Sequence, residues 1–195
     1  MTNRRATTTT SFAALAMTLV LLGAGSSRAA EYVVSKGSQV KFTAKITASS
    51  FVATTQAVRG TVELTNGASE LQRATLVVAA DSFTTGMSLR DAHMRDKYLE
   101  AATFPEVRFE TANAAKPNER GVAEVVGDFI VKGVRKGDKL TVTAMNEGTK
   151  LRVTARTKLD ITAFGIPQPK FAVVKMDPVL DVEIELVLEP KPTAP

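Results

Sequence analysis

The sequence has 195 residues, of which 44% are hydrophobic and 23% are charged, with a single histidine and no cysteine. This length and hydrophobic content indicate one globular domain with a sizeable core. The lack of cysteine excludes disulfides, thiolate nucleophiles, cysteine-type zinc sites and a lipidated cysteine. With one histidine and no clustered carboxylates, we expect no metal site.

The first residues are typical of a secretory signal peptide. Two arginines precede an apolar run over residues 12–25, and Ser27 and Ala29 are small residues at the spacing that signal peptidase reads. We therefore predict a signal peptide over residues 1–29, cleaved after Ala29 or alternatively after Ala30, and a periplasmic or secreted protein. A retained membrane anchor is the other interpretation, but the run is shorter than the ~20 apolar residues that cross a bilayer.

Cleavage would also change the charge of the protein. The whole sequence has a formal charge of +5, and removal of Arg4, Arg5 and Arg28 would lower it to +2. The remaining basic residues are interleaved with acidic ones, so the chain lacks the basic patch that is typical of nucleic-acid-binding proteins. We expect no nucleic-acid partner.

The rest of the sequence shows the period-two alternation of β-strands. In "QVKFTAKI", residues 39–46, the apolar side chains fall on one face, and residues 151–159 and 180–188 repeat this pattern. Gly127 interrupts another apolar run, where a glycine often marks a bulge or a bend at a barrel corner.

Roughly eight or nine such segments, joined by short turns without helical crossovers, predict an all-β antiparallel fold. A closed up-and-down barrel and a sandwich both fit this pattern. A closed barrel leaves no exposed strand edges, and about eight strands can enclose one small ligand.

Residues 88–110, "SLRDAHMRDKYLEAATFPEVRFE", break this alternation. Ser88 and Asp91 have the spacing of a capping box and predict a helix from Leu89 to about Ala101. Phe104-Pro105 would end the helix and return the chain to an extended conformation.

Two interpretations of this helix are open. In the first it is a lid, whose apolar residues belong to the core and whose charges face solvent. In the second it is a polar rim, where His93, Arg90 and Asp91 hydrogen-bond the head of a ligand whose tail lies in the barrel. Catalysis is disfavoured because Ser88 has a predicted capping role and no G-x-S-x-G motif is present. We therefore predict no catalytic residues.

The segment "TTGMSLRDAHMRDKYLEAATFPEVRF" resembles the signature of the YceI-like, polyisoprenoid-binding family, and "RGTVEL", "GDFIVKGVRKGDKLTV" and "LDITAFGIPQP" extend the resemblance. The resemblance implies a single extended, lipocalin-like antiparallel β-barrel of about eight strands over residues 30–190. It implies one short helix after the fourth strand. Residues 191–195 are expected to be a flexible tail.

The resemblance also implies a function. The barrel would hold a long isoprenoid, such as a polyprenyl quinone or its phenolic precursor, without enzymatic activity and with no cofactor besides the lipid. Arg95 occupies a position of the family motif. Four residues that the resemblance makes candidates for ligand binding, Arg90, Asp91, His93 and Met94, occupy the others. The residues that this resemblance and the helical pattern make candidates for ligand binding are Phe83, Arg90, Asp91, His93, Met94, Tyr98, Phe104, Phe109, Phe164 and Ile166.

Three functional hypotheses are compatible with the sequence. The first is an exported carrier or store for an isoprenoid or another long-chain lipid. The second is a structural or interaction module whose barrel is filled by its own side chains, and the third is an enzyme that acts on such a lipid with His93 as acid or base. Transient contact with a membrane surface and a homodimer are open as further partners.

Overall fold

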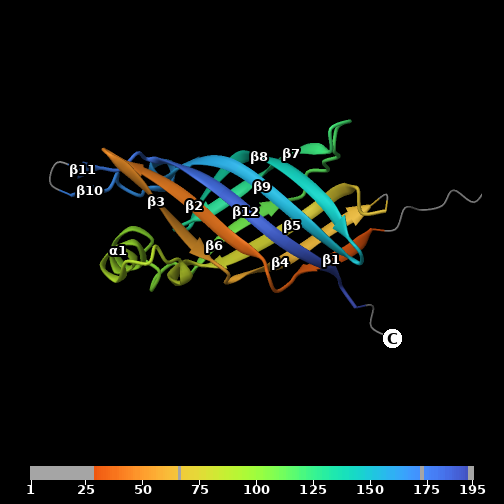
Figure 1. Cartoon of the computed structure of the whole chain (residues 1–195), viewed down its shortest axis with the longest axis horizontal. Helices are drawn as coiled ribbons and strands as arrows, with labels where there is room; N and C mark the ends of the chain where they lie inside the picture. The colour runs from red at the N-terminus through yellow and green to blue at the C-terminus, as the bar shows by residue number, and fades with distance from the viewer. Residues whose placement is uncertain (1–28, 66, 172–173, 193–195) are drawn as a thin grey trace, which may run out of the picture.

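The computed structural model describes residues 29–65, 67–171 and 174–192, which form a β-barrel with one short helical segment (Figure 1). The strands are β1 (Ala30–Val34), β2 (Gln39–Ile46), β3 (Ser49–Thr55), β4 (Val58–Thr65), β5 (Glu70–Ala79), β6 (Glu106–Thr111), β7 (Val122–Val131), β8 (Val134–Glu147), β9 (Lys150–Asp160), β10 (Lys170–Phe171), β11 (Val174–Lys175) and β12 (Val179–Pro190). The helical turns are η1 (Ala80–Ser82), α1 (Ser88–His93), the π-helical turn η2 (Met94–Tyr98) and η3 (Ile161–Phe164).

Eight antiparallel strands close the barrel in the order β1-β4-β5-β6-β7-β8-β9-β12. The ring closes at β1, which pairs with β4 along one edge and with β12 along the other. The predicted single antiparallel barrel is therefore confirmed, and the sandwich alternative is wrong because a sandwich would leave the edges of β1 and β12 apart.

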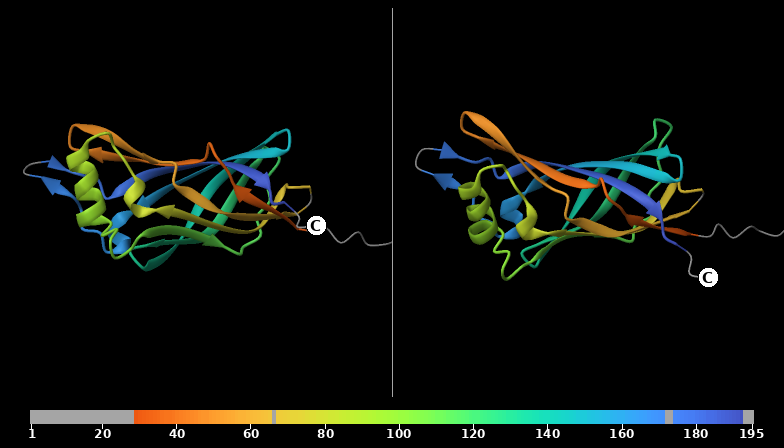
Figure 2. Two further views of the ribbon diagram at one scale, coloured as in Figure 1. Left: turned by 90° about the horizontal axis from the view of Figure 1, so that it is seen from below. Right: turned by 60° about the horizontal axis from the view of Figure 1, so that its bottom comes forward.

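The β2–β3 hairpin lengthens the wall beyond the closed ring. β1 pairs with residues 188–190 of β12, and β2 pairs with residues 181–185 along the same edge of that strand. β3 was not predicted from the sequence, because its residues show no clear alternation. Its outer edge joins the rest of the barrel through the Thr54–Thr84 bridge. In Figure 2, α1 lies across this end of the barrel, opposite the end where the described C-terminus lies.

The alternation seen in the sequence gives the inner face of the barrel. Val40 and Ala44 of β2, Leu151 and Ala155 of β9, and the even-numbered residues of β12 from Leu180 to Leu188 point inward, and all but Val182 are buried in one core cluster. Burial of these apolar side chains is the main stabilising contribution to the barrel.

Gly127 does not form the predicted bulge. It pairs in unbroken register with Asp138 of β8. Its role is to leave space for Phe109: a Cβ atom at Gly127 would lie 2.7 Å from the Phe109 ring carbon Cε2 and 2.8 Å from the carbonyl oxygen of Glu110. A glycine is needed here because of close packing rather than because of a bend.

We expect Gly127→Ala to lower the free energy of unfolding by about 1–3 kcal/mol, since the Phe109 ring must shift within a packed core. Gly137→Ala on the neighbouring strand is the matched control, because a Cβ atom there would make an ordinary contact at 3.5 Å with Asp128. Urea unfolding of both variants measures the difference. Equal stability of the two variants would contradict this account of Gly127.

The ends of the chain fall largely outside the described region. The predicted signal peptide, residues 1–29, lies outside the described residues except for Ala29, and β1 begins at the next residue. Lys191, placed in the predicted tail, donates a backbone and a side-chain hydrogen bond to Glu31, each 2.8 Å long. Among residues 29–65, 67–171 and 174–192, no helix has the length and hydrophobicity that a membrane crossing requires.

Candidate ligand-binding cavity

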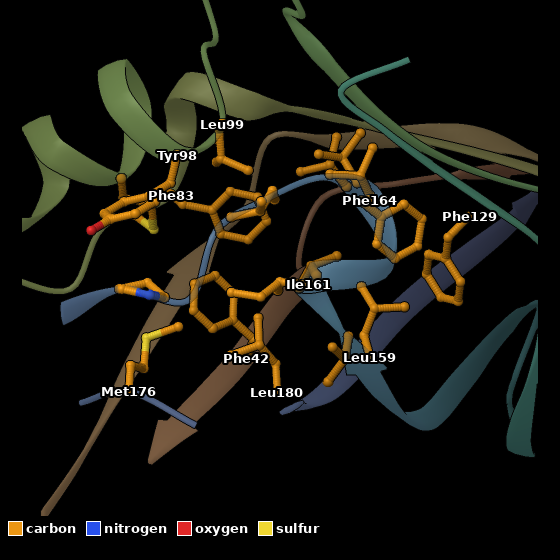
Figure 3. A pocket seen from close by; sticks show the side chains of 18 of the residues that line it. Phe42, Phe83, Tyr98, Leu99, Phe129, Leu159, Ile161, Phe164, Met176 and Leu180 are labelled. Carbon is orange, nitrogen blue, oxygen red and sulfur yellow. The ribbon is translucent and has the colours of Figure 1, made fainter. Parts of the chain in front are cut away.

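The barrel encloses a cavity of about 520 Å³ at the end covered by α1 and η2. This volume is within the range of small-molecule binding sites. Figure 3 shows the cavity extending from Tyr98 and Met176, near the helical turns, to Phe129 and Phe164 deeper in the barrel. The interior of the barrel is therefore not filled by the protein's own side chains.

Two pairs of aromatic rings form much of the wall. Phe42 and Phe83 lie 5.5 Å apart between ring centroids at 55°, and Phe109 and Phe129 lie 5.0 Å apart at 54°. Such tilted arrangements are favourable for aromatic pairs. Apart from six residues with polar side chains, the lining side chains are aliphatic, phenylalanine, methionine or proline. An apolar tail fits these walls.

Asp91 fixes the start of the helical segment. Its carboxylate accepts hydrogen bonds from Thr84 Oγ1 at 2.7 Å, Thr85 N at 2.8 Å and Thr85 Oγ1 at 2.6 Å. Thr84 in turn exchanges two backbone hydrogen bonds, both 2.9 Å long, with Thr54 of β3. The predicted capping box is wrong: the helix begins at Ser88, its N-cap is Met87, and no side chain caps it.

Glu100 fixes the other end of this segment. After the π-helical turn η2, closed by the hydrogen bond from Leu99 N to Met94 O, Glu100 adopts a left-handed conformation with φ of 50°. Its carboxylate forms an ion pair of 2.6 Å with Lys132 in the turn between β7 and β8. π-Helical turns occur frequently at functional sites, and here η2 directs Met94, Lys97 and Tyr98 to the cavity.

Eight of the ten predicted ligand-binding residues line this cavity: Phe83, Arg90, His93, Met94, Tyr98, Phe109, Phe164 and Ile166. Asp91 does not line it and instead anchors the helix. Phe104 also lies outside the lining and approaches Gly133, where an added Cβ atom would lie 3.3 Å from the Phe104 ring. A ligand-binding role for these residues stays a prediction.

Arg95 lies one helical turn after Asp91, but the two side chains do not form an ion pair. Arg95 donates two hydrogen bonds, of 2.7 and 2.9 Å, to the adjacent Asp96. Arg95 therefore faces solvent with Asp96, although it occupies a motif position.

Much of the cavity wall was not predicted from the sequence. Alternation placed Phe42 and Val182 on inner faces, but it carries no information on how far along the barrel each side chain lies. Ile161 lies in a 3₁₀ turn and Met176 beside the short β11, where no strand period exists to read. No metal-binding group of three His, Cys, Asp or Glu residues occurs in the described part of the chain.

We expect Asp91→Asn to destabilise the folded state by about 1 kcal/mol at neutral pH, because the amide cannot accept all three hydrogen bonds. The Thr85 hydroxyl and then Thr84 lower the pKa of Asp91. The stabilisation is therefore full above the unfolded pKa of about 4 and is lost progressively as pH falls from there through the lower pKa of the folded state. Urea unfolding should show a smaller gap between variant and wild type at pH 3 than at pH 7. Asp96→Asn, which removes an exposed pair, is the control and should change neither value.

The fold and the cavity together define a class: a small closed antiparallel barrel with an apolar interior that is open to a ligand. The model of the YceI-like domain matches residues 32–188, so the chain belongs to the YceI-like domain family. A UPF0312 protein of Pseudomonas savastanoi pv. phaseolicola is 30% identical over 186 residues, covering 90% of this chain and 95% of the relative.

Two solved structures share the fold. BcnA of Burkholderia cenocepacia superposes with a TM-score of 0.68 at 18% identity, covering 77% of this chain and 95% of that chain. A polyisoprenoid binding domain from Saccharophagus degradans superposes with a TM-score of 0.61 at 14% identity, covering 84% of this chain and 100% of that chain. At these identities the similarity shows the fold alone.

Proposed function

We propose that this protein binds a long apolar isoprenoid chain inside its barrel and holds or carries it in the cell envelope. The observation that carries the proposal is the apolar cavity of about 520 Å³ in a barrel of this family. The name of the Saccharophagus domain, which describes it as polyisoprenoid-binding, supports the same class of ligand.

The cavity has the physical properties that a prenyl chain requires. Such a chain gains about 25 cal/mol for each Å² of apolar surface removed from water and needs few hydrogen bonds along its length. Ordering of the flexible chain offsets part of this gain. A lining of Phe, Leu, Ile and Val side chains therefore provides affinity for the tail without specific polar recognition.

Export is part of this proposal. The signal-peptide pattern of residues 1–29 supports it, and β1 begins at Ala30, so cleavage after Ala29 would leave the whole barrel in the mature protein. A periplasmic or secreted location would put the cavity in contact with the lipids of the envelope. Membrane-surface contact and a homodimer stay predictions.

The other two hypotheses have less support. A module filled by its own side chains does not agree with the cavity. An enzyme with a Ser-His-Asp arrangement would need Asp91 beside His93, whereas the Asp91 carboxylate is hydrogen-bonded to Thr84 and Thr85. Binding therefore explains the site better than catalysis does.

The test is the lipid content of the purified protein. We expect organic extracts of the folded protein to contain a prenyl lipid by mass spectrometry, and we expect the delipidated protein to bind prenyl alcohols of increasing length with increasing affinity. Well-folded protein that neither carries nor takes up any prenyl or acyl chain would refute the proposal.

A further inference from the structure

Basic side chains border the cavity, and Arg90, Lys97 and Lys170 among them are cations. Arg90, His93, Lys97 and Lys170 lie at the helical end of the barrel, and no Asp or Glu is among the described residues that line it. Arg108 also borders the cavity, but its guanidinium pairs with Glu110, two residues along the same strand, at 2.8 Å. The walls deeper in the barrel, from Phe109 to Phe164, are apolar. The cavity is thus amphipathic, with positive charge at one end only.

These cations differ from most others in the protein in their lack of an ion pair. On the outer face of the barrel, lysines and arginines are commonly ion-paired, as Lys41 and Arg156 are with Glu183. Among the described residues, neither Arg90 nor Lys97 nor Lys170 forms an ion pair. Arg90 and Lys97 therefore have no direct ion-pair partner in the described part of the chain, although the Arg90 charge lies close enough to Asp91 to help lower the pKa of that carboxyl.

Aromatic rings hold two of these cations in place. The guanidinium carbon of Arg90 lies 4.2 Å from the centroid of the Phe51 ring, and Lys97 Nζ lies 5.5 Å from the centroid of the Tyr98 ring. Such contacts attract a cation to the face of the ring, and the half-buried Arg90 is held more closely than the exposed Lys97. The N–H donors of a cation held in this way suit a ligand that supplies acceptors.

The two acidic side chains of α1 and η2 are hydrogen-bonded to residues outside the cavity lining. Both oxygens of Asp91 accept hydrogen bonds from Thr84 and Thr85, and Asp96 is held by Arg95. Neither carboxylate borders the cavity. An anion that entered the cavity would therefore meet Arg90, His93 and Lys97 without a competing carboxylate from the described lining.

We propose that the ligand is an anionic amphiphile, with a carboxylate or phosphate head bound by Arg90, His93 and Lys97 and its tail in the barrel. This inference rests on the proposed lipid-binding function. An uncharged quinone or phenol head would leave Arg90 and Lys97 without an ion-pair partner among the described residues. An anionic head would accept hydrogen bonds from the Arg90 guanidinium, whose planar fork matches the oxygens of carboxylates and phosphates. The head-group site thus selects for charge, and the apolar wall selects for a tail.

The experiment compares two ligands with the same tail. Geranylgeranyl phosphate and geranylgeraniol are titrated into delipidated protein by calorimetry, with wild type, Arg90→Gln/Lys97→Gln and the control Arg120→Gln/Lys136→Gln. The control removes two exposed cations that form no ion pair with any described residue and lie outside the cavity lining. We expect wild type and control to bind the phosphate at least tenfold more tightly than the alcohol. In the Arg90/Lys97 variant this ratio should fall to about one, mainly through weaker binding of the phosphate.

The outcomes separate the two proposals. Equal affinity of wild type for both ligands would overturn the anionic head and leave the lipid-binding function standing, whereas binding of neither ligand would refute the function itself. Equal loss of phosphate and alcohol binding in the variant would show that Arg90 and Lys97 shape the cavity rather than recognise charge. If the variant keeps its phosphate preference and loses only co-sedimentation with vesicles of anionic phospholipid, these cations contact a membrane and the inference is wrong.

Discussion

Val182→Trp is expected to weaken the binding of a prenyl chain at least tenfold while the barrel stays folded. Val182 points inward from β12, opposite Phe42 of β2, and lines the cavity. It is only half-buried, although Leu180 and Ile184 on the same face are buried. The indole of Val182→Trp would extend into the cavity and occupy space that the lipid tail needs. Because the cavity is empty, the indole would enter it without displacing packed core atoms.

The matched control for this variant is Val126→Trp. Val126 lies on β7 between the buried Val125 and Gly127, and its own side chain is 42% exposed. The same substitution there adds the same ring to the outer face and should leave binding unchanged. Titration of geranylgeraniol into both variants, with thermal unfolding to verify the fold, measures the effect. Unchanged affinity in Val182→Trp would show that the tail does not occupy this cavity.

The barrel walls could be predicted because strand alternation is a local property. Val40 and Ala44 follow from two-residue periodicity alone, and both are buried as expected. Ring closure is a further step, since it depends on β1 meeting β12 across almost the whole length of the chain. The family resemblance, rather than the periodicity, distinguished the barrel from a sandwich.

The site was harder to predict because its geometry depends on competition between local bonds. Ser88 and Asp91 have capping-box spacing, but Thr84 and Thr85 offer three donors to the same carboxylate and bind it instead. The sequence contains both options, and only the tertiary contact of Thr84 with Thr54 of β3 favours the second. This contact turns the helix so that Arg90 stacks on Phe51.

The cavity inside the barrel was also hard to predict from the sequence. Small residues such as Ala44 and Ala155 suggest room in the sequence, yet both are buried in the core cluster and neither lines the cavity. The cavity is bordered instead by large side chains, including Phe42 and Phe129. Rings that pack against one another at a tilt, as Phe42 does with Phe83, line the cavity without filling it. Residue size alone therefore does not predict whether a barrel is hollow.

Phe129→Ala is expected to have the largest effect on stability. Phe129 is 5% exposed, packs against Phe109 and lines the inner end of the cavity (Figure 3). Removal of a buried phenylalanine costs about 3–5 kcal/mol. For a domain of this size, each kcal/mol lowers the midpoint temperature of unfolding by about 2–4 °C. We therefore expect a fall of roughly 6–20 °C in the ligand-free protein.

The same variant should change which chain lengths are preferred. Without the Phe129 ring the cavity extends further along the barrel, so a longer prenyl alcohol should gain affinity over a shorter one relative to wild type. Phe51→Ala, at the helical end and half-buried, is the control: it should cost less stability and leave the chain-length preference unchanged. Calorimetric titration with farnesol and geranylgeraniol reads out the preference, and thermal unfolding reads out the stability. If Phe51→Ala and Phe129→Ala shift the preference equally, the tail does not run from the helical end toward Phe129, and the orientation that places its head beside Arg90 is wrong.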